Sequence, residues 1–274
     1  MSIDACVEMV RSGDPDRFMS VMASPPDVRA RLFVLYAFNL EIARAPWVTK
    51  EEMIAEMRLQ WWADAIDEIY QGKLARHHEV VEQLALVIHN HDLPRDLFDG
   101  IIAARRFDIY AEPHQNRADL DMYIRATSGN LMRLAGLSLG AEEPTLDIIR
   151  TFSYGVGVGN LFRALPALYA NKKDPIPVNG SLDRNAIAEG QAPENLRHII
   201  FEIAEDAAAD LQAARAQRHL VPKHTRAAFL PGWQAMVPVW IAYKTPELIL
   251  SKPLETSEFQ KKSSLMWAAL SGRW

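Results

Sequence analysis

The sequence contains almost no cysteine, since Cys6 is the only one in 274 residues. A single thiol excludes an intramolecular disulfide and a cysteine-ligated metal cage, and it is compatible with a reducing compartment. No stretch approaches the roughly 20 apolar residues that a membrane-spanning helix needs. The N-terminal segment MSIDACVEMVRSGDPDRF has early acidic residues and no long apolar run. We therefore expect no secretory signal and a cytoplasmic protein.

An excess of basic charge is also missing. The chain carries 30 Lys and Arg residues against 35 Asp and Glu residues, which gives a formal net charge of -5. A general nucleic-acid binder needs a basic surface for its phosphate contacts, so we expect no nucleic-acid partner. Hydrophobic residues make up 49% and charged residues 24%, which is typical of a soluble globular protein with a sizeable core.

Strand-like alternation of polar and apolar residues is nearly absent, and nothing repeats at a fixed period. Apolar residues recur instead at the three-to-four spacing of helices. The predicted helices cover residues 3–11, 16–22, 28–45, 51–72, 74–91, 94–110, 120–139, 151–170, 182–189 and 193–220, with short kinked helices in 225–243 and a terminal helix in KKSSLMWAALSGRW. No internal linker is evident. We predict an all-α fold class and a single domain over residues 1–274.

Local signals add detail to these helices. Asp27 and Thr49 are predicted to be N-caps. The stripe of the helix over 28–45 is expected to face the core, and it consists of Leu32, Leu35, Tyr36 and Asn39. The buried face of the helix over 51–72 is predicted to consist of Ile54, Met57, Trp61, Ala65 and Ile69.

The helix over 151–170 contains no acidic residue, because none occurs between Asp147 and Asp174. It therefore cannot bind a metal through its own carboxylates. Gly155 and Gly159 form a small-residue edge, and we predict close helix packing rather than a phosphate-binding loop because no βαβ unit is visible. On an adjacent face, Asn160 and Arg163 lie three residues apart and point the same way.

Two carboxylate clusters invite a metal-binding interpretation. Asp64, Asp67 and Glu68 have spacings of three and four, which suit oxygen ligation of Mg²⁺. A solvated face of an amphipathic helix is the more typical explanation, both for this set and for the pair Asp206 and Asp210. The histidines lack the i, i+4 spacing of a metal site, and we expect His77, His78, His89 and His91 on the surface.

The helix over 51–72 also combines a cation, aromatic rings and a carboxylate, in Arg58, Gln60, Trp61, Trp62 and Asp64. Such a face can line an apolar pocket with a few polar anchors. By periodicity alone, it is a core face with a charged edge. No Ser-His-Asp or Cys-His arrangement can be located from one sequence, because such partners meet only in space.

Four segments together resemble the squalene/phytoene synthase family, and they occur in the order found in that family: LYAFNLEIAR (35–44), MRLQWWADAIDEIYQGK (57–73), YIRATSGNLMRLAG (123–136) and GVGVGNLFRALPAL (155–168). The resemblance covers about residues 14–219, and the RLQWW-D block is its most specific part. It implies the isoprenoid synthase fold, a helical bundle around a central cavity.

Active members, as the resemblance implies, join two isoprenyl diphosphates head to head, with Mg²⁺ held by two aspartate-rich motifs. Here the expected aspartate positions hold other residues: Ala43, Arg44, Trp47, Ala164 and Leu168. Glu41 is the only carboxylate near the first set, and Pro166 lies between the last two positions. Arg44 even places a positive charge where a cation would bind. We predict a pseudoenzyme with no catalytic residues, no metal ligands and no cofactor.

The segments FNLEIA, MRLQWW and LFRALP resemble those of the non-catalytic branch of the family, which serves as an assembly factor for respiratory complex I. The implied partner is a protein, or else an isoprenoid lipid or diphosphate. The candidate cavity and substrate-binding residues are Phe38, Glu41, Arg58, Trp61, Asp64, Tyr123, Asn160 and Arg163.

One alternative is an active prenyltransferase that condenses isoprenyl diphosphates in isoprenoid biosynthesis. It requires a relocated Mg²⁺ site, and the available carboxylates are Glu41, Asp64, Asp67 and Glu68.

Another alternative is a lipid-binding module with peripheral contact to the inner membrane. The terminal segment places Trp267 and Trp274 beside Lys261 and Lys262, as interfacial helices do. A packed terminal helix is the more common outcome for so short a segment.

Overall fold

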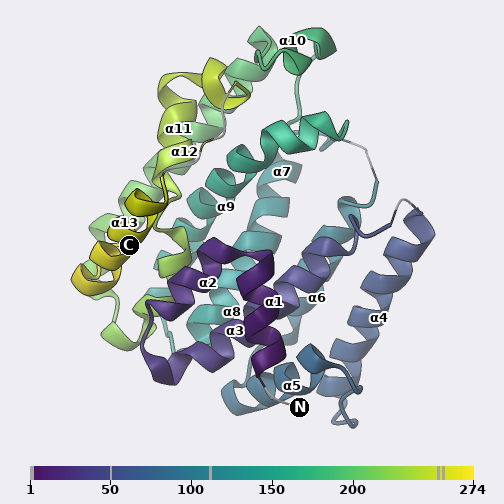
Figure 1. Cartoon of the computed structure of the whole chain (residues 1–274), viewed down its shortest axis with the longest axis vertical. Coiled ribbons are helices and arrows are strands. Elements are labelled where there is room, and N and C mark those ends of the chain that lie inside the picture. The colour runs from purple at the N-terminus through teal and green to yellow at the C-terminus, as the bar shows by residue number, and fades with distance from the viewer. Residues whose placement is uncertain (1–2, 50, 111–112, 252–253, 255–256) are drawn as a thin grey trace. The chain divides into compact units, whose positions relative to one another are not determined.

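The computed structural model describes residues 3–49, 51–110, 113–251, 254 and 257–274. Within these ranges every regular element is a helix and no strand occurs, which confirms the predicted all-α class (Figure 1). The chain forms two compact units: residues 1–110, 130–146 and 221–231 make the first, and residues 111–129, 147–220 and 232–274 make the second. The single-domain organisation and the central cavity stay predictions. In the described part of the chain, no helix is both long and apolar enough to cross a bilayer.

The first unit contains seven α-helices: α1 (Asp4–Gly13), α2 (Pro15–Met22), α3 (Pro26–Arg44), α4 (Glu52–Tyr70), α5 (Glu79–His91), α6 (Arg95–Phe107) and α8 (Asn130–Ser138), together with the 3-10 helix η3 (Lys223–Ala228). The predicted stripe of α3 is buried, with Leu32 and Leu35 fully covered and Asn39 7% exposed. The Phe38 ring lies edge-on to Trp62 of α4 and Phe98 of α6, at centroid distances of 5.6 and 5.3 Å. This aromatic contact joins three helices of the unit.

Three predictions about the ends of these helices are wrong. Asp27 is not an N-cap, because α3 begins at Pro26 after an extended Pro25, and Asp27 lies in the first turn. Thr49 is not the N-cap of α4 either, since Glu51 occupies that position. The Thr49 hydroxyl accepts a hydrogen bond from the Glu51 backbone N–H at 3.0 Å, so it stabilises the turn before the helix. The predicted helix over 74–91 begins only at Glu79, where the His78 ring accepts from the Val80 N–H.

The predicted buried face of α4 is wrong by about one residue. Ile54 and Met57 are 42% and 65% exposed, and only Ala65 and Ile69 of the predicted set are buried. The covered face consists of Ala55, Leu59, Trp62, Ala65, Ile66 and Ile69. Apolar residues occur on most sides of this helix, so a three-to-four spacing can be drawn through more than one face. Packing against the other helices of the first unit decides which face of α4 is covered.

The second unit contains α7 (Arg117–Ile124), the π-helical turn η1 (Arg125–Gly129), α9 (Thr145–Ala170), α10 (Arg184–Ala188), α11 (Glu194–Ala216), the short 3-10 helices η2 (Arg218–Leu220) and η5 (Pro246–Ile249), α12 (Met236–Lys244) and α13 (Glu258–Ser271). A further 3-10 turn, η4 (Leu230–Gly232), lies where the chain enters this unit. The single helix predicted over 120–139 is therefore interrupted. Its π-turn includes Thr127, whose hydroxyl donates to the Tyr123 carbonyl at 2.7 Å. This side-chain hydrogen bond competes with the backbone hydrogen bonds of the helix.

The glycines of α9 allow the close helix packing that the sequence predicts. A Cβ atom on Gly155 would lie 2.4 Å from Leu211 Cγ and 2.9 Å from the Ala207 carbonyl oxygen, both on α11. A Cβ atom on Gly159 would lie 2.8 Å from the carbonyl oxygen of Ala235, just before α12. These distances are shorter than real Cβ contacts, so backbone approaches backbone at both positions. The glycine-rich edge is a packing feature of the second unit.

Candidate functional site

Five of the eight candidate site residues belong to the first unit, and two of them form an ion pair. Glu41 lies near the end of α3 and Arg58 in the first half of α4, with Arg58 Nη2 3.8 Å from Glu41 Oε2. The Glu41 side chain is 18% exposed and the Arg58 side chain 46% exposed. Phe38, one turn before Glu41, is fully buried in the aromatic contact with Trp62 and Phe98. Phe38 therefore stabilises the packing of α3 against α4 and α6, whereas Glu41 and Arg58 keep partly exposed polar groups.

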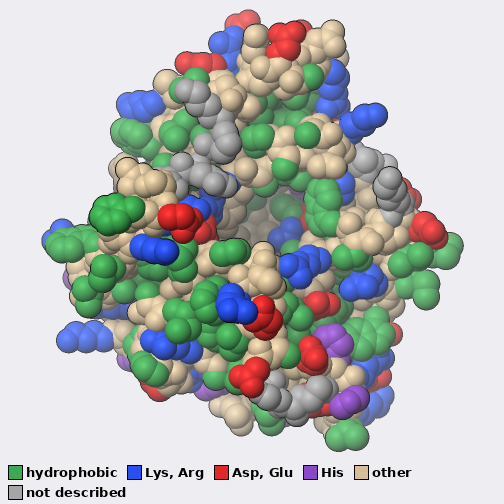
Figure 2. All heavy atoms as spheres, viewed as in Figure 1, with side chains coloured by type: hydrophobic (Ala, Val, Ile, Leu, Met, Phe, Trp, Pro, Cys, Tyr) green, Lys and Arg blue, Asp and Glu red, His purple; other side chains and the backbone are tan. Residues whose placement is uncertain are grey.

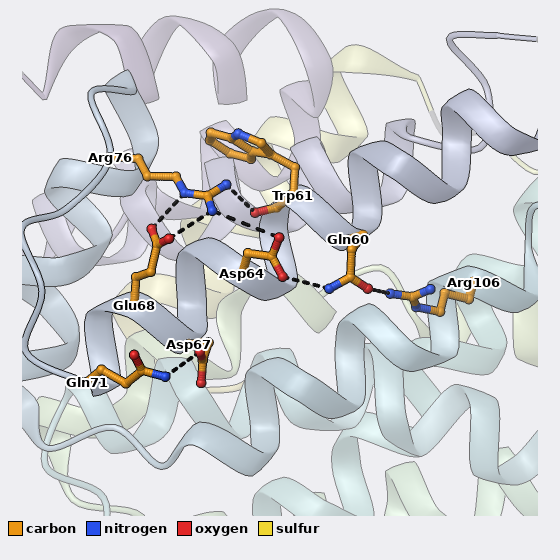
Figure 3. A network of polar contacts seen from close by, with 8 residues as sticks. All are labelled: Gln60, Trp61, Asp64, Asp67, Glu68, Gln71, Arg76 and Arg106. Atoms are coloured by element: carbon orange, nitrogen blue, oxygen red, sulfur yellow. Dashed lines mark hydrogen bonds and ion pairs between the residues drawn. The ribbon is translucent and has the colours of Figure 1, made fainter.

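Arg76 organises the polar side of α4 (Figure 3). Its guanidinium donates from Nε and Nη2 to the two oxygens of Glu68, at 2.7 and 2.9 Å, and from Nη1 to the Trp61 carbonyl at 3.2 Å. It also lies 3.9 Å from Asp64 and stacks over the Trp61 ring at 5.1 Å. The hydrogen bonds from Arg76 hold the pKa of Glu68 below its usual value. One arginine thus contacts three side chains of the helix: those of Trp61, Asp64 and Glu68.

The network continues along α4 in both directions. Gln60 donates to Asp64 at 2.7 Å and accepts from Arg106 at 2.7 Å, as Figure 3 shows. Asp67 accepts from Gln71 and lies 2.8 Å from Arg95. Each carboxylate of the predicted cluster therefore faces an arginine: Asp64 and Glu68 share Arg76, and Asp67 pairs with Arg95. This arrangement is a salt-bridge network on a helix surface rather than a converging set of ligands.

The remaining three candidates lie in the second unit. Arg163 donates to Asn160 Oδ1 at 2.7 Å, so these two side chains of α9 meet as the spacing predicts. Tyr123 of α7 packs against the buried His114, with ring centroids 5.2 Å apart. That all eight candidates line one cavity stays a prediction.

A second polar cluster, which we call the Arg117 cluster, joins α7, α9 and α11. Arg117 donates to Asp121, Tyr154 and Asp206, in each case at 2.8 Å, and these four residues define the cluster. The Tyr154 hydroxyl donates to Asp121 at 2.6 Å. Tyr154 is 2% exposed, and burial raises its pKa, as does its hydrogen bond to Asp121. The cluster stabilises three helices by charged hydrogen bonds in a partly buried place.

Sequence reasoning missed most of this cluster. It identified Asp206 and the neighbouring Asp210 only as a solvated pair on one helix. Asp210 is half-buried, and its pKa is raised by burial and by the nearby Asp206 and Asp121, although Arg125 opposes the shift. The partners are far apart in the chain, and the only local signal was the 117–121 spacing of Arg and Asp, which suits a helical ion pair.

The residues present do not fit the Mg²⁺ ions on which the family chemistry depends. Ala43 and Arg44 end α3, and the Arg44 guanidinium packs over Gly13. Ala164 and Leu168, on α9, have no oxygen ligand in their side chains. Among the described residues, no group of three or more His, Cys, Asp or Glu side chains gathers closely enough to hold a metal ion. A metal relocated to α4 would have to displace Arg76 and Arg95 from its ligands.

Solved structures with the same fold include a squalene synthase and a dehydrosqualene synthase. Squalene synthase HpnC from Alicyclobacillus acidocaldarius superposes with a TM-score of 0.71, at 17% identity, over 87% of this chain and 91% of that chain. A dehydrosqualene synthase superposes with a TM-score of 0.74, at 15% identity, over 98% of this chain and 95% of that chain. At these identities the likeness establishes the fold.

Curated relatives carry a different description. The protein named NADH dehydrogenase (ubiquinone) complex I, assembly factor 6, from Homo sapiens is 26% identical over 231 residues, which cover 82% of this chain and 69% of that protein. Its homolog from Drosophila melanogaster is 24% identical over 237 residues, covering 82% of this chain and 70% of that protein. A model of the squalene/phytoene synthase family matches residues 10–237, and the matched segment includes both polar networks described above. This chain belongs to the squalene/phytoene synthase family.

Proposed function

We propose that this chain is a non-catalytic member of its family and acts as an assembly factor of the respiratory complex I type, through a protein partner. The observation that carries the proposal is the lack of carboxylate ligands for Mg²⁺. All five expected aspartate positions hold Ala, Arg, Trp or Leu, and the acidic cluster of α4 is occupied by arginines. Without carboxylates to hold Mg²⁺ against a leaving diphosphate, the ionisation step of the family reaction loses its electrostatic support.

The names of the relatives support a role in complex I assembly. The human, bovine and Drosophila relatives are described as complex I assembly factors and match more than four fifths of this chain. The corresponding role here is to bind a complex I subunit during assembly. The proposal places the chain in the cytoplasm with peripheral contact to the inner membrane.

Deletion of the gene in its source organism tests this role. We expect less assembled NADH dehydrogenase on a native gel, with succinate dehydrogenase unchanged. The wild-type gene should restore the complex, and so should an Asp64→Ala variant, because the proposal assigns that carboxylate no catalytic part. Normal complex I levels after deletion would contradict the proposal.

An isoprenoid lipid or diphosphate is the alternative ligand, and the fold shared with squalene-forming enzymes favours it. Calorimetric titration with farnesyl diphosphate separates the possibilities. Binding that needs no Mg²⁺ would support a lipid-holding pseudoenzyme. Binding that requires Mg²⁺ would favour the active prenyltransferase instead.

A further inference from the structure

Helix α13 packs on the second unit through one of its faces. It begins with a capping box, in which Ser257 accepts from the Gln260 N–H and the Gln260 side chain accepts from the Ser257 N–H. Its inward face is formed by Leu265 and Ala268, which are 5% and 3% exposed. Beyond its end, Trp274 is 2% exposed and lies edge-on to Phe152 of α9 at 4.7 Å. The helix therefore cannot roll without breaking these contacts.

The outward face of α13 is apolar. Phe259, Met266, Trp267 and Leu270 are 80%, 59%, 63% and 81% exposed. Their separations of seven, eight and eleven residues place them on one side of a helix with 3.6 residues per turn. Figure 2 shows hydrophobic side chains, together with charged ones, on the side of the molecule where Figure 1 draws α13. A helix on a soluble domain normally turns its polar side to solvent, so this orientation is the reverse of the usual one.

The charge around this face is opposite to that of the whole chain. Between 258 and 274 there are three basic residues, Lys261, Lys262 and Arg273, and one acidic residue, Glu258, whereas the whole chain has a net charge of -5. Lys261 is mostly covered and lies 3.5 Å from Glu258. Lys262 and Arg273 are exposed, one on the second turn of the helix and one just after its end. Exposed cations thus lie close to the apolar residues, one in the N-terminal half of the helix and one just after its C-terminal end.

We propose that the outward face of α13 docks on an anionic lipid bilayer surface. An exposed tryptophan with large apolar neighbours and flanking cations is the composition of helices that lie in the interface, with the apolar side buried about 5–10 Å below the headgroups. Each lysine or arginine near an anionic leaflet adds electrostatic attraction to it. A second copy of this chain offers no such complementarity, because it would bring the same excess of cations to the contact. This inference does not depend on the role in complex I assembly.

Vesicle flotation of the full-length protein tests the proposal. The probes are vesicles of pure phosphatidylcholine and vesicles of equal parts phosphatidylcholine and phosphatidylglycerol. The informative variants are the double change Trp267→Ser with Leu270→Ser, and the charge reversal Lys262→Glu. The matched control is Leu74→Ser, because Leu74 is 95% exposed and belongs to the first unit, whereas α13 belongs to the second.

We expect the wild type and the Leu74→Ser control to float with the anionic vesicles and much less with the neutral ones. The double variant should lose at least about tenfold in affinity because two large apolar side chains no longer insert. Lys262→Glu should lower the affinity for anionic vesicles at least about fivefold, and this difference from the wild type should shrink at high salt. Thermal unfolding of all variants should match that of the wild type, since the changed side chains face outward.

Four outcomes would overturn the proposal. The first two are that the wild type fails to float with anionic vesicles and that the double variant floats as well as the wild type. The third is light scattering that shows a dimer broken by the double variant, which would assign the face to a second copy. A large loss of thermal stability in the double variant would show that the protein itself covers this face, and it would overturn the proposal as well.

Discussion

Arginine side chains bind the carboxylates of α4 that have the right spacing for a metal site. Arg76 bonds both oxygens of Glu68 and approaches Asp64, and Arg95 pairs with Asp67. The spacing of the acids could be seen in the sequence. Their partners could not, because Arg76 lies in the loop after α4 and Arg95 at the start of α6. A helical carboxylate cluster is therefore an ambiguous signal until the residues that fold over it are known.

Replacing Arg76 tests the strength of this network. Arg76→Gln should lower the free energy of unfolding by about 1 kcal/mol, because a two-point contact to a carboxylate and the stacking on Trp61 are lost while both partners remain partly exposed. Arg11→Gln is the matched control, since its pair with Glu8 is 62% and 59% exposed and should contribute almost nothing. Denaturant unfolding measures both. Equal effects of the two changes would contradict this interpretation.

Asp210 gives a prediction about pH. Burial raises its pKa in the folded protein, so the folded state holds the proton more tightly than the unfolded state does. As pH rises from the ordinary aspartate pKa through the raised one, the folded state loses stability relative to the unfolded state. Asp210→Asn removes this loss, so the variant should be more stable than the wild type at pH 7 and no more stable in acid.

The control for the Asp210→Asn variant is Asp206→Asn. Asp206 accepts a 2.8 Å hydrogen bond from Arg117, so its neutralisation should lower stability at pH 7. Urea unfolding at several pH values measures both variants. The interpretation fails when the two variants change stability in the same direction at neutral pH.

At the scale of single elements, the glycine edge of α9 was visible in the sequence and its neighbours were not. The Gly155 and Gly159 spacing indicates a close approach, and the structure identifies α11 and the segment before α12 as the contacts. The buried face of α4, in contrast, was misplaced because its apolar residues surround the helix. Periodicity specifies a face only where the opposite side is polar.

Gly159→Ala should destabilise the second unit. The added methyl group would lie 2.8 Å from a backbone oxygen that cannot move independently, and overpacking of this kind costs about 1–3 kcal/mol. Gly100→Ala is the control, because the new methyl group meets only the amide end of Asn130, which can rotate away. The control should be neutral or slightly stabilising, since alanine is the better helix former. Thermal unfolding of both variants gives the comparison, and no difference between them would contradict the close packing.

At the scale of the whole molecule, the all-α class and the family could be recognised from the sequence. The helical periodicity and the four segments between residues 35 and 168 carry that recognition, and the family match over residues 10–237 agrees with it. The loss of the aspartates at Ala43, Arg44 and Trp47 was equally visible. The Arg117 cluster was not, and neither was the direction in which the apolar residues of α13 face, although Trp267 and the nearby lysines had indicated a candidate interfacial helix. Both depend on how separate helices turn toward one another, which local pattern does not determine.

The central claim is that the metal-dependent chemistry of the family is absent from this chain. Incubation of the purified protein with farnesyl diphosphate and Mg²⁺, followed by chromatography of substrate and products, tests it most directly. A squalene synthase in parallel shows that the assay works. We predict no consumption of substrate above the protein-free blank. Mg²⁺-dependent consumption that Asp64→Ala abolishes would contradict the claim and show that the carboxylates of α4 hold the metal after all.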